Sequence, residues 1–241
     1  MKLLAIDCST EACSVALLDD TKQVDGGLIG ESFELAPREH TQRLLPMVDH
    51  LLAQTETSLR QLDAIAFGCG PGSFTGLRIC IGAVQGLAFG ADLPVIPVST
   101  LTALAQTGLS SENVSGGDPT VASMRVLSAL DARMDEIYWG IHCVVNGLVV
   151  LEGEEQLSAP EQLTLPESCS DSHWIAVGSG WNYAERIACA SEISIIDNQL
   201  LPRASAVAVL AQRKYQLGHL LQADEAVPTY LRDDVAWKKQ T

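Results

Sequence analysis

The chain has 241 residues, of which 47% are hydrophobic, and this length and composition fit one large or two modest globular domains and exclude a disordered chain. The formal net charge of −15 argues against a protein that grips nucleic acid by itself, because phosphate contacts normally need a basic face. No apolar run approaches the roughly 18 residues that cross a bilayer, and Asp7 interrupts any signal peptide, so we expect a soluble cytoplasmic protein without membrane contact.

The first predicted element is a β-hairpin. Residues 3–20, LLAIDCSTEACSVALLDD, hold an apolar strand that ends at Asp7, a short turn and a second apolar strand. A helix is predicted over 38–54, REHTQRLLPMVDHLLAQ, with Pro46 as a kink or the start of a new turn. Its apolar side chains recur at helical spacing on one face: Leu44, Leu45, Val48, Leu51 and Leu52.

A glycine-rich segment spans residues 68–90, GCGPGSFTGLRICIGAVQGLAFG, at the end of an apolar strand. Its first part suits a turn that brings backbone amides close to an anion, and Ser73 is a candidate N-cap for a helix running to about Gly90. The segment lacks the Gly-Lys-Ser/Thr ending of a P-loop, and its glycines do not have the spacing of the dinucleotide-binding fingerprint. We therefore expect neither of these two nucleotide sites here.

The helical part of this segment carries a stripe of small residues. Gly82, Gly86 and Gly90 recur every four residues, with Gly76, Cys80 and Ala83 nearby. An interior glycine costs a helix up to about 1 kcal/mol relative to alanine, so the stripe indicates close approach of another backbone. That backbone belongs either to the sheet of the same chain or to a helix of another subunit, and the pattern alone does not decide between them.

The later part of the chain repeats the earlier part. A helix is predicted from Ser99, and the polar stretch 108–118, GLSSENVSGGD, is predicted as a link between domains. Residues 126–145, VLSALDARMDEIYWGIHCVV, repeat the strand–Asp–turn–strand pattern. IAVGSG at 175–180 likewise repeats IAFGCG at 65–70.

Strands and helices alternate in both parts, which predicts the α/β class. Two echoes in matching order indicate two duplicated α/β domains of the actin-like architecture, over residues 1–105 and 106–241. A last amphipathic helix, at about 205–222, is a candidate to pack back on the first domain. The alternative is that the strand–Asp–turn–strand pattern is common and recurs without duplication.

The sequence offers little for metal or nucleophilic chemistry. None of the five histidines forms an H-x-x-x-H pair, and the seven cysteines include no C-x-x-C pair. We expect no metal site, and we interpret the cysteines as small buried hydrophobes. His40, with charged neighbours, is interpreted as a helix-surface residue or a contact with another protein.

Three residues of the first hairpin turn are candidates for a degenerate nucleotide site: Asp7, Ser9 and Thr10. In the actin-like architecture this turn cradles phosphates, but Cys8 stands where active kinases typically have glycine, and its Cβ would crowd a phosphate. The alternative role for Asp7, and for Asp131 in the second hairpin, is to cap the turn through nearby amides. We favour the capping role.

Several motifs together resemble one bacterial family. GPGSFTGLR, with PREHTQRLLP before it, EACSVAL, LDARMDEIYW, VGSGW and the tail YLRDDVAWKK are similar to the TsaB (YeaZ) family and extend along most of the chain. The resemblance implies a non-catalytic accessory subunit that pairs with TsaD and with the ATPase TsaE. It implies transfer of threonylcarbamoyl to the anticodon-adjacent adenosine of tRNAs reading ANN codons, with tRNA met only through the complex.

The resemblance further implies a homodimer in the absence of TsaD, no cofactor of its own, and room for ATP or ADP at the interface of the complex. Two helices are expected to form the contact with the partner, through a set of residues that combines apolar side chains with the glycine stripe. The set is His40, Thr41, Leu44, Leu45, Val48, Ser73, Gly76, Leu77, Ile79, Cys80, Gly82, Ala83 and Gly86. The alternative function is an enzyme, either an actin-fold ATP-dependent kinase or an M22-like peptidase.

Overall fold

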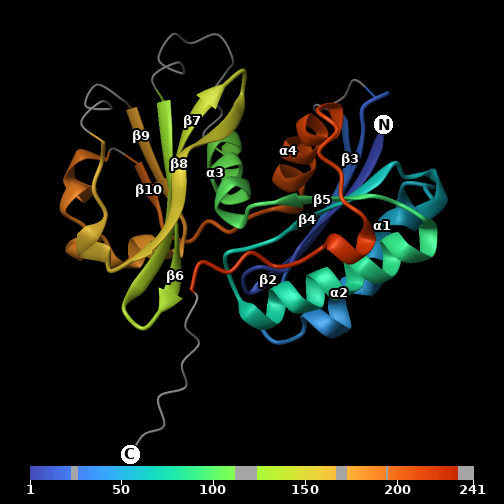
Figure 1. The fold of residues 1–241 in the computed structure, drawn as a ribbon, viewed down its shortest axis with the longest axis horizontal. Helices are drawn as coiled ribbons and strands as arrows, with labels where there is room; N and C mark the ends of the chain where they lie inside the picture. Colours follow the sequence, from blue (N-terminus) through green and yellow to red (C-terminus); the bar gives the residue numbers. More distant parts are fainter. Residues whose placement is uncertain (23–26, 112–123, 167–172, 194, 233–241) are drawn as a thin grey trace, which may run out of the picture.

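The structure is a computed structural model, and it describes residues 1–22, 27–111, 124–166, 173–193 and 195–232. Within these residues the chain forms two five-stranded sheets that stand side by side, with helices between them and on their outer faces (Figure 1).

The first sheet has the order β3-β2-β1-β4-β5. Its strands are β1 (Lys2–Asp7), β2 (Ala12–Asp19), β3 (Leu28–Leu35), β4 (Ala64–Gly68) and β5 (Val95–Val98). β1 pairs antiparallel with β2 and parallel with β4. The second strand of the predicted hairpin and the strand before the glycine-rich segment therefore lie on opposite sides of β1. Both β1 and β2 are buried almost throughout, because helices cover both faces of this sheet.

The second sheet has the order β10-β9-β6-β7-β8, which is the same topology read from the opposite end. Its strands are β6 (Met124–Arg133), β7 (Glu136–Val145), β8 (Leu148–Ser158), β9 (His173–Val177) and β10 (Ile195–Asp197). Here β6 pairs antiparallel with β7 and parallel with β9. Two duplicated α/β units were predicted from the echoes in the sequence, and the matching sheets confirm them.

Helices α1 (His40–Gln54) and α2 (Phe74–Ala91) lie next to each other on the outer face of the first sheet (Figure 1). Helices α3 (Thr100–Ser111) and α4 (Ala204–Gln216) lie between the two sheets. Short 3-10 helices η4 (Pro160–Gln162), η6 (Ser179–Arg186) and η7 (Ala188–Glu192) cover the outer face of the second sheet.

The core between the two sheets is shared by both halves of the chain. It joins side chains of the first sheet and α3 with side chains of the second sheet and α4, among them Leu3, Leu104, Val126, Ile175 and Val207. Helix α4 packs chiefly on β1 and β2, so the last helix rests on the first half. Because apolar area from both halves is removed from water in one cluster, the halves stabilise each other.

Three helix boundaries differ from the sequence prediction. Helix α1 begins at His40, after Arg38 in a left-handed conformation with φ 68°. Helix α3 continues to Ser111, so Gly108 belongs to a helix and not to a link; the remaining link residues, 112–118, lie outside the described residues. A Cβ at Gly108 would lie 2.7 Å from the Val177 side chain, so this glycine serves close packing between α3 and β9.

The third difference is the end of α4 at Gln216, because Gly218, with φ 76°, turns the chain away before residue 222. The proposed boundary between residues 105 and 106 falls inside α3.

The segment after α4 returns along the first half. Leu221 exchanges two backbone hydrogen bonds with Val95, and the amide of Thr229 donates to the carbonyl of Cys69 at 2.7 Å. A further 3-10 helix, η8 (Ala223–Glu225), packs on α2. The guanidinium of Arg232 then pairs with Glu136 in the second half. Residues 219–232 therefore form a strap that contacts both halves, and we call this segment the strap.

One helix among the described residues, α2, is long and apolar enough by length and composition to span a membrane, with 18 residues and a mean hydropathy of 1.3. The expectation that no run approaches this length is therefore wrong. Only 33% of the helix is buried. Its composition reflects two apolar faces, one that packs on the sheet and one that faces outward.

Candidate functional site

The glycine-rich loop before α2 packs directly on the first hairpin turn. The amide of Ser73 donates to the carbonyl of Ser9 at 2.7 Å. A Cβ at Gly72 would overlap the same carbonyl oxygen, and a Cβ at Gly76 would overlap the carbonyl oxygen of Cys8. These glycines are therefore required by contacts within the chain, and the loop fills the space in front of the turn instead of leaving it open for an anion.

The Asp7 carboxylate is buried behind this loop. Its Oδ1 accepts hydrogen bonds from the amide of Ser9 at 3.0 Å and from the Ser9 hydroxyl at 2.8 Å. Its Oδ2 has no hydrogen-bond partner among the described residues and lies where a Cβ of residue 68 would be, so that position accepts only glycine. Burial raises the pKa of Asp7 to about 6, against the lowering effect of the Ser9 hydrogen bonds.

The other residues of the hairpin turns have the same kind of local bonds. The Thr10 hydroxyl accepts from the amide of Ala12 at 3.3 Å. In the second hairpin, Oδ1 of Asp131 accepts from the amide of Arg133 at 2.8 Å. Asp7 and Asp131 thus cap their turns, the role favoured for both from the sequence, while Ser9 donates to Asp7 and Thr10 accepts from the amide of Ala12.

The glycines on the outward face of α2 differ from those of the loop, which pack on the hairpin turn. A Cβ added at Gly82, Gly86 or Gly90 would meet no atom within 4 Å, and all three residues are exposed. Ile79 and Ala83 are partly exposed beside them. The sheet of the same chain therefore does not cover Gly82, Gly86 and Gly90, which excludes one of the two explanations that the sequence left open.

Phe89 belongs to the same face and was missed. Positions 79, 82, 86 and 89 follow one another at the three- and four-residue spacing of a single helix face, and the Phe89 side chain is 85% exposed. A step of three residues beyond Gly86, which is the other spacing that keeps to one helix face, would have found it. We call the set Ile79, Gly82, Ala83, Gly86, Phe89 and Gly90 the glycine face. On the neighbouring helix α1, Leu45 is a further exposed apolar side chain, 47% exposed.

Several residues predicted to contact a partner do not reach the surface. Six of the thirteen point inward: His40, Leu44, Val48, Gly76, Leu77 and Cys80. Three of them, Leu44, Val48 and Cys80, belong to the core under α1 and α2 and hold these helices on the sheet. Nε2 of His40 lies 3.0 Å from the carbonyl of Thr10, to which it donates, so this histidine ties α1 to the hairpin turn and is not a helix-surface residue. The others are exposed or partly exposed: Thr41, Leu45, Ser73, Ile79, Gly82, Ala83 and Gly86.

One edge of α2 is occupied by the strap. The ring of Tyr230 stacks on Phe74 with 5.6 Å between ring centroids, and the guanidinium of Arg78 lies 3.9 Å over the Phe74 ring. The Gln85 side chain donates to the carbonyl of Ala226 at 2.9 Å. The strap therefore frames the glycine face without covering its glycines.

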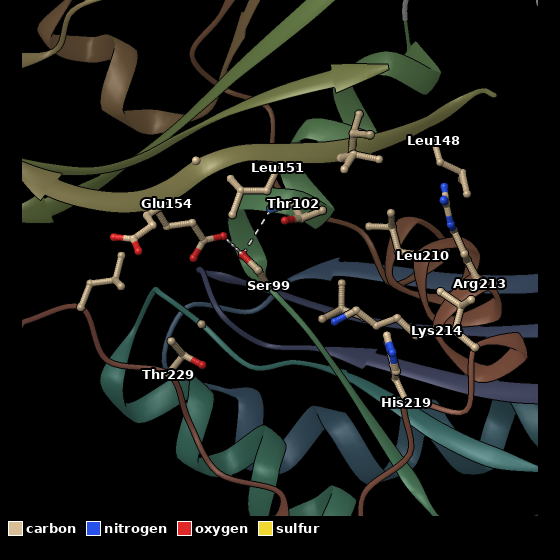
Figure 2. Close-up of a pocket in the computed structure, with 18 residues that line it drawn as sticks. Ser99, Thr102, Leu148, Leu151, Glu154, Leu210, Arg213, Lys214, His219 and Thr229 are labelled. Atoms are coloured by element: carbon tan, nitrogen blue, oxygen red, sulfur yellow. Dashed lines mark hydrogen bonds between the residues drawn. The ribbon is translucent and has the colours of Figure 1, made fainter. Parts of the chain in front are cut away.

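A second candidate site is a cavity of about 700 Å³ between the two halves (Figure 2). It is lined by β8, the start of α3, the end of α4 and residues of the strap. No motif in the sequence indicated it, because its walls combine segments that are far apart in the chain, near residues 70, 100, 150 and 210–231. Among the residues that the structure describes, no group of three or more His, Cys, Asp or Glu side chains is arranged to hold a metal ion.

The duplicated sheets, with two helices between them, define a two-domain α/β protein of the actin-like class. A family model described as TsaD, tRNA N6-adenosine threonylcarbamoyltransferase, matches residues 18–240. The chain is 43% identical over 241 residues to the tRNA threonylcarbamoyladenosine biosynthesis protein TsaB of Escherichia coli K12, covering 99% of this chain and 98% of that protein. It is 42% identical over 253 residues to TsaB of Haemophilus influenzae, with 99% and 97% covered.

Solved structures agree with these relatives. YeaZ from Pseudomonas aeruginosa superposes with a TM-score of 0.84 at 43% identity, covering 95% of this chain and 99% of that chain. A second structure, described as an uncharacterized protein from Pseudomonas aeruginosa with similarity to peptidase YeaZ, gives a TM-score of 0.85 at 43% identity, covering 96% and 99%. The chain belongs to the TsaB (YeaZ) family.

Proposed function

We propose that the chain is an accessory subunit in the biosynthesis of threonylcarbamoyladenosine in tRNA, and that it pairs with TsaD through the glycine face. The curated relatives at 43% and 42% identity are named for this pathway. The observation that carries the contact surface is the open space over Gly82, Gly86 and Gly90. Glycines that cost helix stability and touch nothing in their own chain are explained by a helix of another subunit.

The match to the TsaD family model supports a paired arrangement. The TsaD family model matches residues 18–240, a range that includes α1 and α2, so we expect TsaD to carry an equivalent pair of helices. Two such helix pairs pack face to face about a pseudo-twofold axis and form a four-helix contact, in which bare glycines allow close approach. The same face on a second copy gives a homodimer when TsaD is absent.

We further propose that the chain takes no catalytic step itself and carries no cofactor of its own. The filled space before the first hairpin turn and the capping bonds of Asp7 support this, because a phosphate would have to displace the loop. In the complex, TsaE supplies ATPase activity, tRNA is met only through the assembly, and ATP or ADP is accommodated at the interface. The alternative is an actin-fold kinase or an M22-like peptidase, and one solved relative is described as similar to a peptidase.

The contact surface is tested by Gly82→Leu. The new side chain enters open space, so the monomer keeps its fold and gains up to about 1 kcal/mol of helix stability. The same side chain prevents close approach of a partner helix, so we expect loss of co-purification with TsaD. Gln216→Leu, at an exposed position at the end of α4, is the matched control and should bind as the wild type does. Unchanged binding of Gly82→Leu to TsaD rules out this surface.

The accessory role is tested by reconstitution of threonylcarbamoyladenosine formation in tRNA from purified components, with and without this chain. We expect product only when the chain and TsaD are both present. The chain alone is assayed for ATP hydrolysis and for peptide cleavage. Sustained turnover by the chain alone that is lost in Asp7→Ala would establish the enzymatic alternative.

A further inference from the structure

The cavity between the two halves has features of a binding site for a small molecule. It holds about 700 Å³, within the range of pockets that bind small molecules. It is separate from the glycine face, which lies on the outer side of α2, and from the first hairpin turn, whose residues do not line it. The function proposed above leaves this cavity unused.

Most of the cavity wall is aliphatic. The apolar side chains come from β5, β8 and α4 and from the residue that follows α4: Val98, Leu148, Val149, Leu151, Leu210 and Leu217. In Figure 2 Leu151 lies near Ser99, and Leu148 and Leu210 lie towards the basic end of the cavity. Such walls favour a ligand with an apolar body, because its burial removes apolar area from water.

Two opposite charges face this space, one from the second sheet and one from α4, the helix that packs on the first sheet. Glu155 projects from β8 and accepts a hydrogen bond from the Ser99 hydroxyl, and Ser99 also caps α3 through the amide of Leu101 at 3.1 Å. Lys214 projects from α4, and its ammonium donates to the carbonyl of Pro97 at 2.7 Å. Both side chains are thus fixed by local bonds and leave hydrogen-bonding capacity for a ligand.

Glu155 and Lys214 interact electrostatically, but they do not form an ion pair. Burial raises the pKa of Glu155, and Lys214 acts against this rise. Burial lowers the pKa of Lys214, while Cys69 and Glu155 act to raise it. Lys214 nevertheless forms no ion pair with any residue that the structure describes. The two charges therefore stand within electrostatic reach across the cavity with a gap between them, and each is poorly solvated.

The other acidic and basic side chains of the cavity are divided between its two ends in the same way. Glu154 lies at the Glu155 end, and Arg213 and His219 lie at the Lys214 end (Figure 2). An anion alone would meet the two glutamates, and a cation alone would meet the basic end. A dipolar ligand satisfies both ends, through charge-assisted hydrogen bonds that are the stronger kind in a poorly solvated site.

We propose that this cavity binds a small zwitterion with an aliphatic body, a free apolar α-amino acid or a short apolar peptide. Its ammonium donates to Glu155, its carboxylate accepts from Lys214, and its side chains lie against the leucine and valine walls. A single amino acid bridges the two charges with one residue, and a short peptide bridges them with its two ends.

The test is isothermal titration calorimetry of the full chain with two probes, L-leucine and the tripeptide Leu-Leu-Leu. We expect saturable binding of at least one probe, and which of the two binds identifies the source of the zwitterion. N-acetyl-L-leucine lacks the ammonium and L-leucinamide lacks the carboxylate. If leucine binds, each derivative should bind at least about tenfold more weakly than leucine. If only the tripeptide binds, its acetylated and amidated forms should each bind at least about tenfold more weakly than the tripeptide itself.

Two variants locate the site. Lys214→Met keeps the aliphatic stem without the charge, and Glu155→Gln keeps the shape and the bond to Ser99 without the charge. Each variant should bind the probe at least about tenfold more weakly than the wild type does. Lys22→Met and Glu185→Gln, at exposed positions outside the cavity, are the matched controls and should bind as the wild type does. Circular dichroism establishes that each variant is folded.

Three results would overturn the proposal: no saturable binding of either probe, equal binding of the blocked derivatives, or full binding by both folded cavity variants. The derivative comparison uses only the wild-type protein, so the proposal remains testable even if a variant does not fold.

Discussion

At the scale of single residues, the glycines of one segment have two opposite roles. Gly72 and Gly76 face backbone atoms of the first hairpin turn, whereas Gly82, Gly86 and Gly90 face open space. A spacing of four residues occurs within each group, but Gly82 follows Gly76 by six residues, so the two groups lie on different faces; the sequence does not say which of these faces the rest of the chain covers. What separates them is the position of the turn at Cys8 and Ser9, which is more than sixty residues away in the chain.

This difference predicts opposite effects of the same substitution. In Gly76→Ala the new Cβ overlaps the carbonyl oxygen of Cys8, which belongs to rigid backbone, so we expect a loss of about 2 kcal/mol or more. In Gly86→Ala the Cβ meets nothing, so we expect a gain of up to about 1 kcal/mol from helix propensity. Urea unfolding of the two variants measures both free energies, and equal effects would contradict the assigned packing.

Two buried titratable groups predict a compensated pH dependence. Burial raises the pKa of Asp7 from 3.8 to about 6, so between these values the folded state binds more protons, and Asp7 favours folding less as pH rises. Burial lowers the pKa of His142 from 6.5 to about 4, so here the unfolded state binds more protons, and stability rises with pH. The two effects oppose each other between about pH 4 and 6.

Replacing one of the two groups should reveal the pH dependence of stability that the other group causes. In Asp7→Asn the His142 effect remains, so we expect stability to fall as pH is lowered from about 6.5 towards 4, by at most roughly 3 kcal/mol. In His142→Gln the Asp7 effect remains, so stability should instead increase as pH is lowered over the same range. Denaturant unfolding at several pH values measures both slopes, and slopes of the same sign would show that the two groups are not buried as described.

At the scale of elements, the helices with clear local signals were predicted well. The sequence placed α2 from Ser73 to about Gly90, and the helix begins at Phe74 with the Ser73 hydroxyl accepting from the amide of Gly76 at 3.3 Å. Helix α4 was predicted too long, since it ends at Gln216 and the apolar residues Leu220 and Leu221 already belong to the strap. The contacts of the strap with β5 and α2 depend on pairings between distant segments, which periodicity does not contain.

The candidate site was predicted in part for the same reason. Helical spacing places Leu45, Gly82 and Gly86 on faces that turn out to be exposed, but it cannot say which side of a helix the sheet will cover. Leu44, Val48 and Cys80 were therefore assigned to the contact surface although they face the core. The cavity was not predicted, because it exists only after the two halves and the strap have come together.

The end of α2 offers a prediction at this scale. Asp92 terminates the helix in the left-handed conformation, with φ 55°, which costs a residue with a side chain about 1 kcal/mol relative to glycine. Asp92→Gly should therefore stabilise the protein by about that amount. Asp49→Gly, at an exposed position inside α1, is the matched control and should destabilise it by about 0.3 kcal/mol, because aspartate is itself a poor helix former. A thermal unfolding series that ranks the two variants in the reverse order would contradict the assigned helix end.

At the scale of the whole molecule, the shared core and the strap make the two halves one cooperative unit. Side chains from both sheets are buried in a single cluster, and Arg232 links the strap to Glu136 after the strap has paired with Val95. An actin-like enzyme needs a cleft that opens and closes, whereas an accessory subunit benefits from halves that hold a fixed shape for a partner. We therefore expect the halves to unfold together.

The tryptophans allow this to be tested. Trp139, Trp174 and Trp181 are all buried in the second half, so in a Trp237→Phe background their fluorescence reports on that half alone. Leu44→Ala removes a buried side chain from α1 in the first half and should cost about 2–5 kcal/mol. If the halves are coupled, the denaturant midpoint measured by tryptophan fluorescence falls together with the midpoint measured by far-ultraviolet circular dichroism. A fluorescence midpoint that stays at the background value while the circular dichroism midpoint falls would mean that the halves unfold independently, and the rigid form expected of an accessory subunit would then require its partner.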